Sequence, residues 1–115
     1  MRARAADNGG MTQSTPMALT ERQRKTLRGL GHKLHPIARI GDKGLSPTVT
    51  AELEQALEHH ELIKVSVRAG DRSVRSGLIE DLCRVSGATL VQRIGNVALV
   101  FRRNPDAPRV VLGSR

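Results

Sequence analysis

Aromatic side chains are almost absent from this chain: Phe101 is the only one among 115 residues, and there is no Trp or Tyr. Proteins that bind single-stranded RNA by stacking its bases on aromatic side chains need two or three such rings. A stacking platform of this kind is therefore excluded. Any binding of RNA must depend on charge and on contacts with the sugar-phosphate backbone.

Cysteine and long apolar runs are equally scarce. Cys83 is the single cysteine, so no internal disulfide can form, which fits a reducing cytoplasm. It lies among apolar residues, and we expect a buried small side chain there rather than a nucleophile. No apolar run approaches the length of a membrane span, and residues 1–16 lack the apolar stretch of a secretory signal. The sequence therefore predicts a cytoplasmic protein without membrane contact.

Acidic residues are outnumbered, and the charge is unevenly distributed. There are 19 Lys and Arg against 11 Asp and Glu, for a net charge of +8 and a pI near 11.2. Residues 17–44 contain seven basic and two acidic residues, whereas residues 48–61 contain four acidic residues and no Lys or Arg. A domain this basic usually binds a polyanion, most often RNA or DNA, although a merely solvated basic surface stays open at this point.

Capping residues and apolar spacing predict the secondary structure. Thr20 and Gln23 match a capping box that opens a helix over residues 20–32, and a short strand follows at 37–40. A second helix is predicted over 47–60 and an alternating strand over 62–67. Asp71 can cap a third helix, at 72–86, for which the predicted apolar stripe is Val74, Leu78, Leu82 and Val85.

Two strands, at 89–94 and 97–102, close the pattern around a Gly95-Asn96 hairpin signal. The order helix-strand-helix-strand-helix-strand-strand predicts one compact α/β domain with a mixed four-stranded sheet packed with helices. We expect the domain at residues 17–103, a disordered tail at 1–16 and a flexible tail at 104–115. The true start stays open between Met1, Met11 and Met17.

The most informative motif joins the first strand to the second helix. Gly41-Asp42-Lys43-Gly44 is a G-x-x-G loop, in which two glycines let backbone N–H groups come close to a phosphate. Ser46 and Pro47 suit the cap and first position of the next helix, which places the positive end of a helix dipole beside the loop. A G-x-x-G sequence alone is also typical of a plain turn.

Several segments together are similar to a known family. Residues 19–30, His35-Pro36, residues 40–45 and residues 56–65 resemble the YhbY-like proteins of the chloroplast RNA splicing and ribosome maturation (CRM) domain family. Ser86-Gly87-Ala88, Ile94-Gly95 and Phe101-Arg102 extend the resemblance, which covers residues 17–103. The resemblance implies an α/β fold similar to the C-terminal half of a bacterial translation initiation factor, and a G-x-x-G loop like that of K-homology domains. It also implies association with precursors of the large ribosomal subunit.

Carried onto this sequence, the resemblance implies a set of RNA-binding residues. The loop residues would be Gly41, Asp42, Lys43 and Gly44, and the flanking basic residues Arg22, Lys25, Arg28, Lys33 and Arg39. Two departures stand out. Asp42 places a carboxylate in the loop, and Phe101 stands where the family often has a tyrosine.

Other chemistry finds little support. His32, His35, His59 and His60 lack further ligands at metal-binding spacing, and no nucleophile elbow, P-loop or dinucleotide fingerprint occurs. We expect a monomeric, non-enzymatic protein without metal or cofactor that binds ribosomal RNA and assists assembly of the large subunit. The alternative is an adaptor that binds a basic protein on ribosomal particles through Glu52, Glu54 and Glu58.

Overall fold

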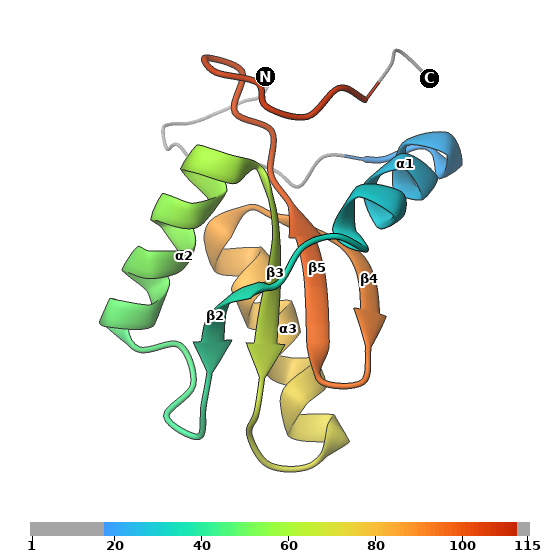
Figure 1. The fold of residues 1–115 in the computed structure, drawn as a ribbon. Helices are drawn as coiled ribbons and strands as arrows, with labels where there is room; N and C mark the ends of the chain where they lie inside the picture. The colour runs from blue at the N-terminus through green and yellow to red at the C-terminus, as the bar shows by residue number, and fades with distance from the viewer. Residues whose placement is uncertain (1–17, 113–115) are drawn as a thin grey trace, which may run out of the picture.

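Three helices and four strands follow one another along residues 18–112, the part of the chain that this computed structural model describes (Figure 1). Their bounds are α1 Glu21–Gly31, β2 Pro36–Ile40, α2 Pro47–His60, β3 Leu62–Val67, α3 Arg72–Ser86, β4 Thr89–Ile94 and β5 Val97–Phe101. The predicted element order is confirmed, and every predicted boundary agrees to within one residue. The tail expected at residues 1–16 lies outside the described residues.

Each helix begins at a residue whose side chain accepts a hydrogen bond from a backbone N–H of the first turn. Thr20 and Gln23 form the reciprocal capping box of α1, Ser46 caps α2, and Asp71 caps α3. A capping residue of this type stabilises a helix by about 1 kcal/mol relative to alanine. These contacts are local in sequence, which explains why the helix starts could be predicted.

The four strands form one sheet in the order β2-β3-β5-β4. β2 and β3 run parallel with α2 as their crossover, whereas β3–β5 and β5–β4 are antiparallel. The turn Gly95-Asn96 joins β4 to β5 as predicted. Three connections lie at the same end of the strands, at the bottom of Figure 1: the β2–α2 loop (41–46), the β3–α3 connection (68–71) and this hairpin turn. We call this end of the sheet the loop end.

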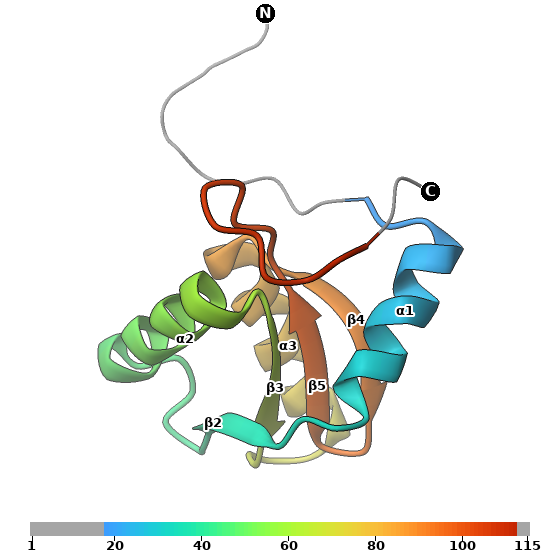
Figure 2. The ribbon, with the colours of Figure 1, turned by 45° about the horizontal axis from the view of Figure 1, so that its top comes forward.

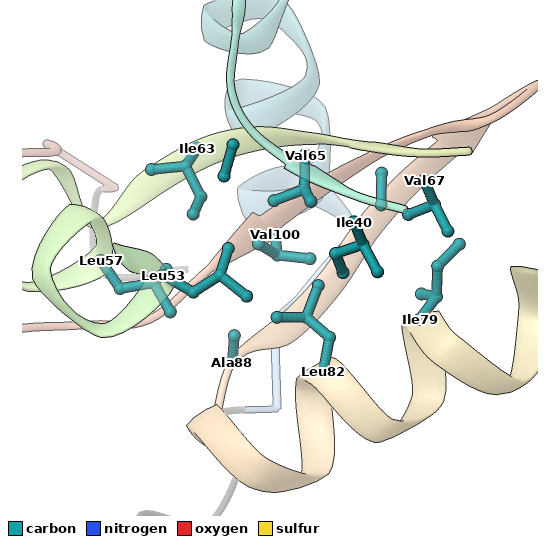
Figure 3. Packing of buried hydrophobic residues seen from close by; sticks show 12 residues of the cluster. Ile40, Leu53, Leu57, Ile63, Val65, Val67, Ile79, Leu82, Ala88 and Val100 are labelled. Atoms are coloured by element: carbon teal, nitrogen blue, oxygen red, sulfur yellow. The ribbon is translucent and has the colours of Figure 1, made fainter. Parts of the chain in front are cut away.

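The main core lies between one face of the sheet and the two helices α2 and α3 (Figure 3). Ile63, Val65 and Val67 of β3 point toward this core, as their alternation predicts. The helices contribute Leu53, Leu57, Ile79 and Leu82. This layer fixes α2, and therefore the loop before it, against the sheet.

The apolar stripe predicted for α3 is only partly right. Leu82 is buried and Leu78 is half-buried, but Val74 and Val85 are 49% and 44% exposed. Ile79 is buried instead. Two overlapping stripes are present in this helix, and packing against the sheet selects the one that contains Ile79 and Leu82.

The opposite face of the sheet is covered by α1 and by the end of the chain. Leu27 of α1 is fully buried with Leu62 and Phe101, whose side chains project on the side opposite to the main core. Arg24 anchors the helix further, because its Nη1 donates a hydrogen bond to the carbonyl oxygen of Leu90 at 2.9 Å. The sheet is therefore enclosed on both faces over part of its area.

The C-terminal segment, residues 102–112, crosses the domain between α2 and α1 (Figure 2). The fully buried carboxylate of Glu61 accepts hydrogen bonds from the backbone N–H groups of Asn104, Arg109 and Val110 at 2.6–2.9 Å. It also pairs with the guanidinium of Arg103 at 3.1 Å. The sequence places residues 104–112 in a tail outside the domain. In the structure, this buried carboxylate binds the segment to the α2–β3 junction.

Glu61 has an unusual backbone and an unusual ionisation. Its φ of 63° is the only positive φ of a non-glycine residue among residues 18–112, and such a conformation costs about 1–3 kcal/mol. Burial acts to raise the pKa of the Glu61 carboxyl, but the three backbone N–H donors and Arg103 outweigh it, and the pKa is lowered. The charged carboxylate is therefore what holds the segment in place.

Candidate nucleic-acid interface

The G-x-x-G loop is a tight turn with an open outer surface. The N–H of Gly44 donates to the carbonyl oxygen of Gly41 at 2.9 Å, and Gly44 has a left-handed φ of 69°. A Cβ built on Gly41 meets no atom within 4 Å, so the backbone is accessible there. Asp42 and Lys43 between them are exposed. The loop can therefore bring its main chain and one ammonium group close to an anion.

The loop leads directly into the N-terminus of α2. Ser46 Oγ accepts a hydrogen bond from the N–H of Val49 at 3.2 Å, and Pro47 occupies the first turn of the helix. No acidic residue lies in that first turn. No acidic side chain of the first turn therefore offsets the partial positive charge of the helix end, which suits the binding of a phosphate.

Two arginines lie beside the loop, one on β2 and one directly after β3. Arg39 is exposed near the end of β2, and Arg68 is exposed directly after β3. Both line a shallow surface pocket of about 540 Å³ along β2, which also includes Ser66. The backbone N–H of Arg68 donates to the carbonyl oxygen of Ile40 at 2.8 Å, which holds Arg68 at the start of the loop. Sequence reasoning missed Arg68, because only the β2–β3 pairing brings it to this position.

The structure divides the predicted flanking residues into two groups. Arg39 and Lys43 share the loop end, whereas Arg22 and Lys25 are exposed on α1, toward the upper right of Figure 1 and away from the loop. The other two lie between these groups. Arg28 is half-buried, with Nη2 at 4.0 Å from a carboxylate oxygen of Glu21, and Lys33 is exposed in the connection to β2.

Comparison with known proteins identifies the family. The model of the CRS1/YhbY (CRM) domain matches residues 19–102. The chain belongs to this family. A probable RNA-binding protein of Pseudomonas aeruginosa is 47% identical over 89 residues, which cover 77% of this chain and 86% of that protein. A probable RNA-binding protein of Bacillus subtilis is 33% identical over 94 residues, covering 82% of this chain and 98% of that protein.

A solved structure supports the same assignment. The solution structure of a hypothetical protein from Staphylococcus aureus, described as a candidate RNA-binding protein, superimposes with a TM-score of 0.71 at 31% identity. The match covers 84% of this chain and 100% of that one. The α/β fold predicted from the sequence is thus confirmed for this CRM domain.

The two departures from the family pattern have clear structural settings. Phe101 is fully buried beneath α1, and the guanidinium carbon of Arg103 lies 5.4 Å from the centre of its ring. A phenylalanine there needs no hydrogen-bond partner. Asp42 is exposed, and its carboxylate makes no hydrogen bond or ion pair with another residue in the described range 18–112. It therefore does not cap the turn.

The acidic helix of the CRM domain is partly neutralised from within. Arg102 donates to Glu54 Oε1 at 2.8 Å and to Glu58 Oε1 at 3.2 Å. The buried carboxylate of Glu61, directly after the helix, pairs with half-buried Arg103. Only Glu52 is left as an exposed carboxylate of α2 with no ion pair inside the described part of the chain. The surface that the adaptor alternative requires is thus much less acidic than the sequence implies.

Other kinds of site gain no support from residues 18–112. Within that range, no group of three or more His, Cys, Asp or Glu side chains could hold a metal ion. Cys83 is half-buried, and burial raises the pKa of its thiol, which opposes a role as a nucleophile. In the same part of the chain, no helix combines the length and the apolar character that crossing a membrane requires.

Proposed function

We propose that this CRM domain is a non-enzymatic RNA-binding protein whose ligand is ribosomal RNA in precursors of the large subunit. The observation that carries the proposal is the open G-x-x-G turn, which contains Lys43, leads into the N-terminus of α2 and is flanked by Arg39 and Arg68. The relatives from Pseudomonas aeruginosa and Bacillus subtilis described above are named probable RNA-binding proteins, which supports RNA as the partner. The ribosomal ligand rests on the family resemblance.

The proposed mechanism has two steps. The exposed cations of α1 and its connection to β2, among them Arg22, Lys25 and Lys33, attract the RNA over a distance set by ionic strength. The backbone N–H groups of loop 41–43, the N-terminal end of α2 and the side chain of Lys43 then hold a phosphate at close range, while the N–H of Gly44 closes the turn. The protein acts as a monomer in the cytoplasm, and the RNA that it binds undergoes no covalent change.

Crosslinking the protein to RNA in cells and sequencing the attached fragments tests the proposal. We expect fragments of large-subunit ribosomal RNA, and co-sedimentation of the protein with large-subunit precursors rather than with translating ribosomes. Fragments from the small subunit alone would overturn the ribosomal assignment and leave RNA binding intact. If Lys43→Ala retains full association with particles while Glu52→Ala loses it, the adaptor alternative replaces RNA binding by the loop.

A further inference from the structure

A second group of basic residues lies at the loop end, outside the residues that the sequence predicts. Arg72 and Arg75 of α3, Arg93 of β4, and the turn residues Gly95 and Asn96 line one surface pocket of about 310 Å³. No carboxylate lines this pocket. Three guanidinium groups thus converge from two segments that are about twenty positions apart in the chain.

This arrangement gathers three like charges with no carboxylate in the pocket lining. Arg72 and Arg75 lie in the first turn of α3, where the exposed N–H groups already carry partial positive charge, and that turn contains no acidic residue. The nearest carboxylate in sequence is Asp71, and its Oδ1 accepts the capping hydrogen bond from the N–H of Val74. Asp71 thus compensates the helix end, whereas an anion in the pocket would compensate the three guanidinium groups.

The arginines are held in position and retain donors for a ligand. Nη1 of Arg75 donates to the carbonyl oxygen of Gly70 at 2.9 Å, and Nη1 of Arg93 donates to Ser76 Oγ at 2.6 Å. The Nε of Arg75 is buried and has no hydrogen-bond partner in the described part of the chain. Because this atom is buried, the donors open to a ligand are the remaining N–H groups of the three guanidinium groups, for which a phosphate oxygen is a strong acceptor.

The pocket is joined to the G-x-x-G loop through the sheet. The N–H of Val67 donates to the carbonyl oxygen of Asn96 at 2.7 Å, and the next residue, Arg68, donates to Ile40 at 2.8 Å. The hairpin turn, the β3–α3 connection and the loop are therefore neighbours along the loop end (Figure 1). Arg68 lies between the two groups of cations.

We propose that Arg72, Arg75 and Arg93 form a second phosphate site, which binds the backbone of the same RNA that the G-x-x-G loop holds. This inference rests on the proposed function and extends it by a separate set of residues. The ligand group is a phosphodiester of RNA, and a free phosphate ion is the competing source of the same chemistry.

The test compares two exposed arginines at opposite ends of α3. Arg72→Gln removes a charge from the pocket, and Arg84→Gln removes the same charge from the last turn, where Arg84 pairs with Asp81 at 2.9 Å. Binding of an unstructured polyuridine RNA is measured across a salt series for the wild type, both variants and Lys43→Ala. We expect Arg72→Gln to lower the slope of log affinity against log salt by about one, as one phosphate contact would. Arg84→Gln should leave the slope unchanged.

Nuclear magnetic resonance of the wild-type arginine Nε–H groups gives a readout that does not depend on a variant. The Arg75 Nε–H signal should shift on addition of the RNA at concentrations where inorganic phosphate, at equal ionic strength, leaves it in place. Equal slopes for Arg72→Gln and Arg84→Gln, or an Arg75 signal that phosphate alone saturates, would overturn the second site. If instead the wild type binds no RNA, the proposed function itself fails, and the second site falls with it.

Discussion

Nη1 of Arg102 lies 2.8 Å from Oε1 of Glu54, so the residue after β5 is bonded to the middle of α2. The same guanidinium donates to the carbonyl oxygen of Ser86 at the end of α3 and to Glu58. One side chain, only 14% exposed, thus joins both helices of the main core to the sheet. Glu54 and Glu58 of α2 are therefore paired within the domain, which makes them less available to bind a partner.

Arg102→Ala should therefore destabilise the fold. The change leaves the Ser86 carbonyl oxygen and the Glu54 carboxylate without this donor and removes one of the two donors to Glu58, and we expect the free energy of unfolding to fall by about 1–3 kcal/mol. Urea unfolding measures the loss. Glu52→Ala is the control, because exposed substitutions usually change stability by no more than about 0.5 kcal/mol. Equal midpoints for the two variants would show that the Arg102 contacts contribute nothing.

The second prediction concerns acid. The pKa of Glu61 is lower in the folded protein than its ordinary value of 4.5, so its stabilising effect is fully present above that value. It is lost as the pH falls through the lower pKa of the folded state. Glu61→Gln should cost about 1–3 kcal/mol at pH 7, because the charged acceptor of three backbone N–H groups and Arg103 is removed.

The difference between wild type and Glu61→Gln should then shrink as the pH is lowered from 5 toward 2. The measurement is urea unfolding of both proteins over this range. The contributions of the other carboxyl groups to the free energy of unfolding are common to both proteins and cancel in the difference. A difference that stays constant down to the lowest pH would mean that the charge of Glu61 is not what binds the C-terminal segment.

The two loop glycines should respond differently to alanine. A Cβ on Gly41 enters open space at an ordinary φ, so Gly41→Ala should fold normally and lose RNA affinity only because the backbone can no longer approach the phosphate. Gly44 has a φ of 69°, and Gly44→Ala should cost about 1–2 kcal/mol of stability as well. Paired urea and RNA-binding measurements separate the effects. Full RNA affinity in Gly41→Ala would exclude close approach at that residue.

Salt dependence provides the fourth prediction. With a net charge of +8 and a single, buried aromatic residue, RNA affinity should fall linearly with salt on a double-logarithmic plot. Lys43→Ala should lower that slope by about one unit and leave the unfolding midpoint nearly unchanged. Glu52→Gln is the control on the neighbouring helix. Affinity that is insensitive to salt, or that differs strongly between polyuridine and polyadenosine, would contradict backbone binding.

The sequence predicts this fold well because its signals are local. Thr20 with Gln23, Ser46 with Pro47, and Asp71 with Gly87 mark helix ends within a few residues, and their hydrogen bonds form as expected. The choice between two apolar stripes on α3 depends on the sheet instead. Ile79 could be assigned to the core only once the packing of α3 against its neighbours was known.

The candidate site is less predictable for the same reason. The G-x-x-G loop is contiguous, so its residues could be named from the sequence. Arg68 reaches the loop only through the pairing of β2 with β3, and Arg93 reaches α3 only through the β4–β5 hairpin. The partners of Glu61 lie more than forty positions away, and spacing gives no signal for such a contact.

The hydrogen bonds from Val67 to Asn96 and from Arg68 to Ile40 have a consequence for selectivity. They tie the hairpin turn to β3 and the residue after β3 to the end of β2, so that the sheet would hold the G-x-x-G turn and the arginine pocket at a set separation. An RNA whose phosphates are spaced to match would engage both places at once, and one with a different curvature only one of them. The domain would thus discriminate among RNAs by the path of the strand and not by the identity of its bases.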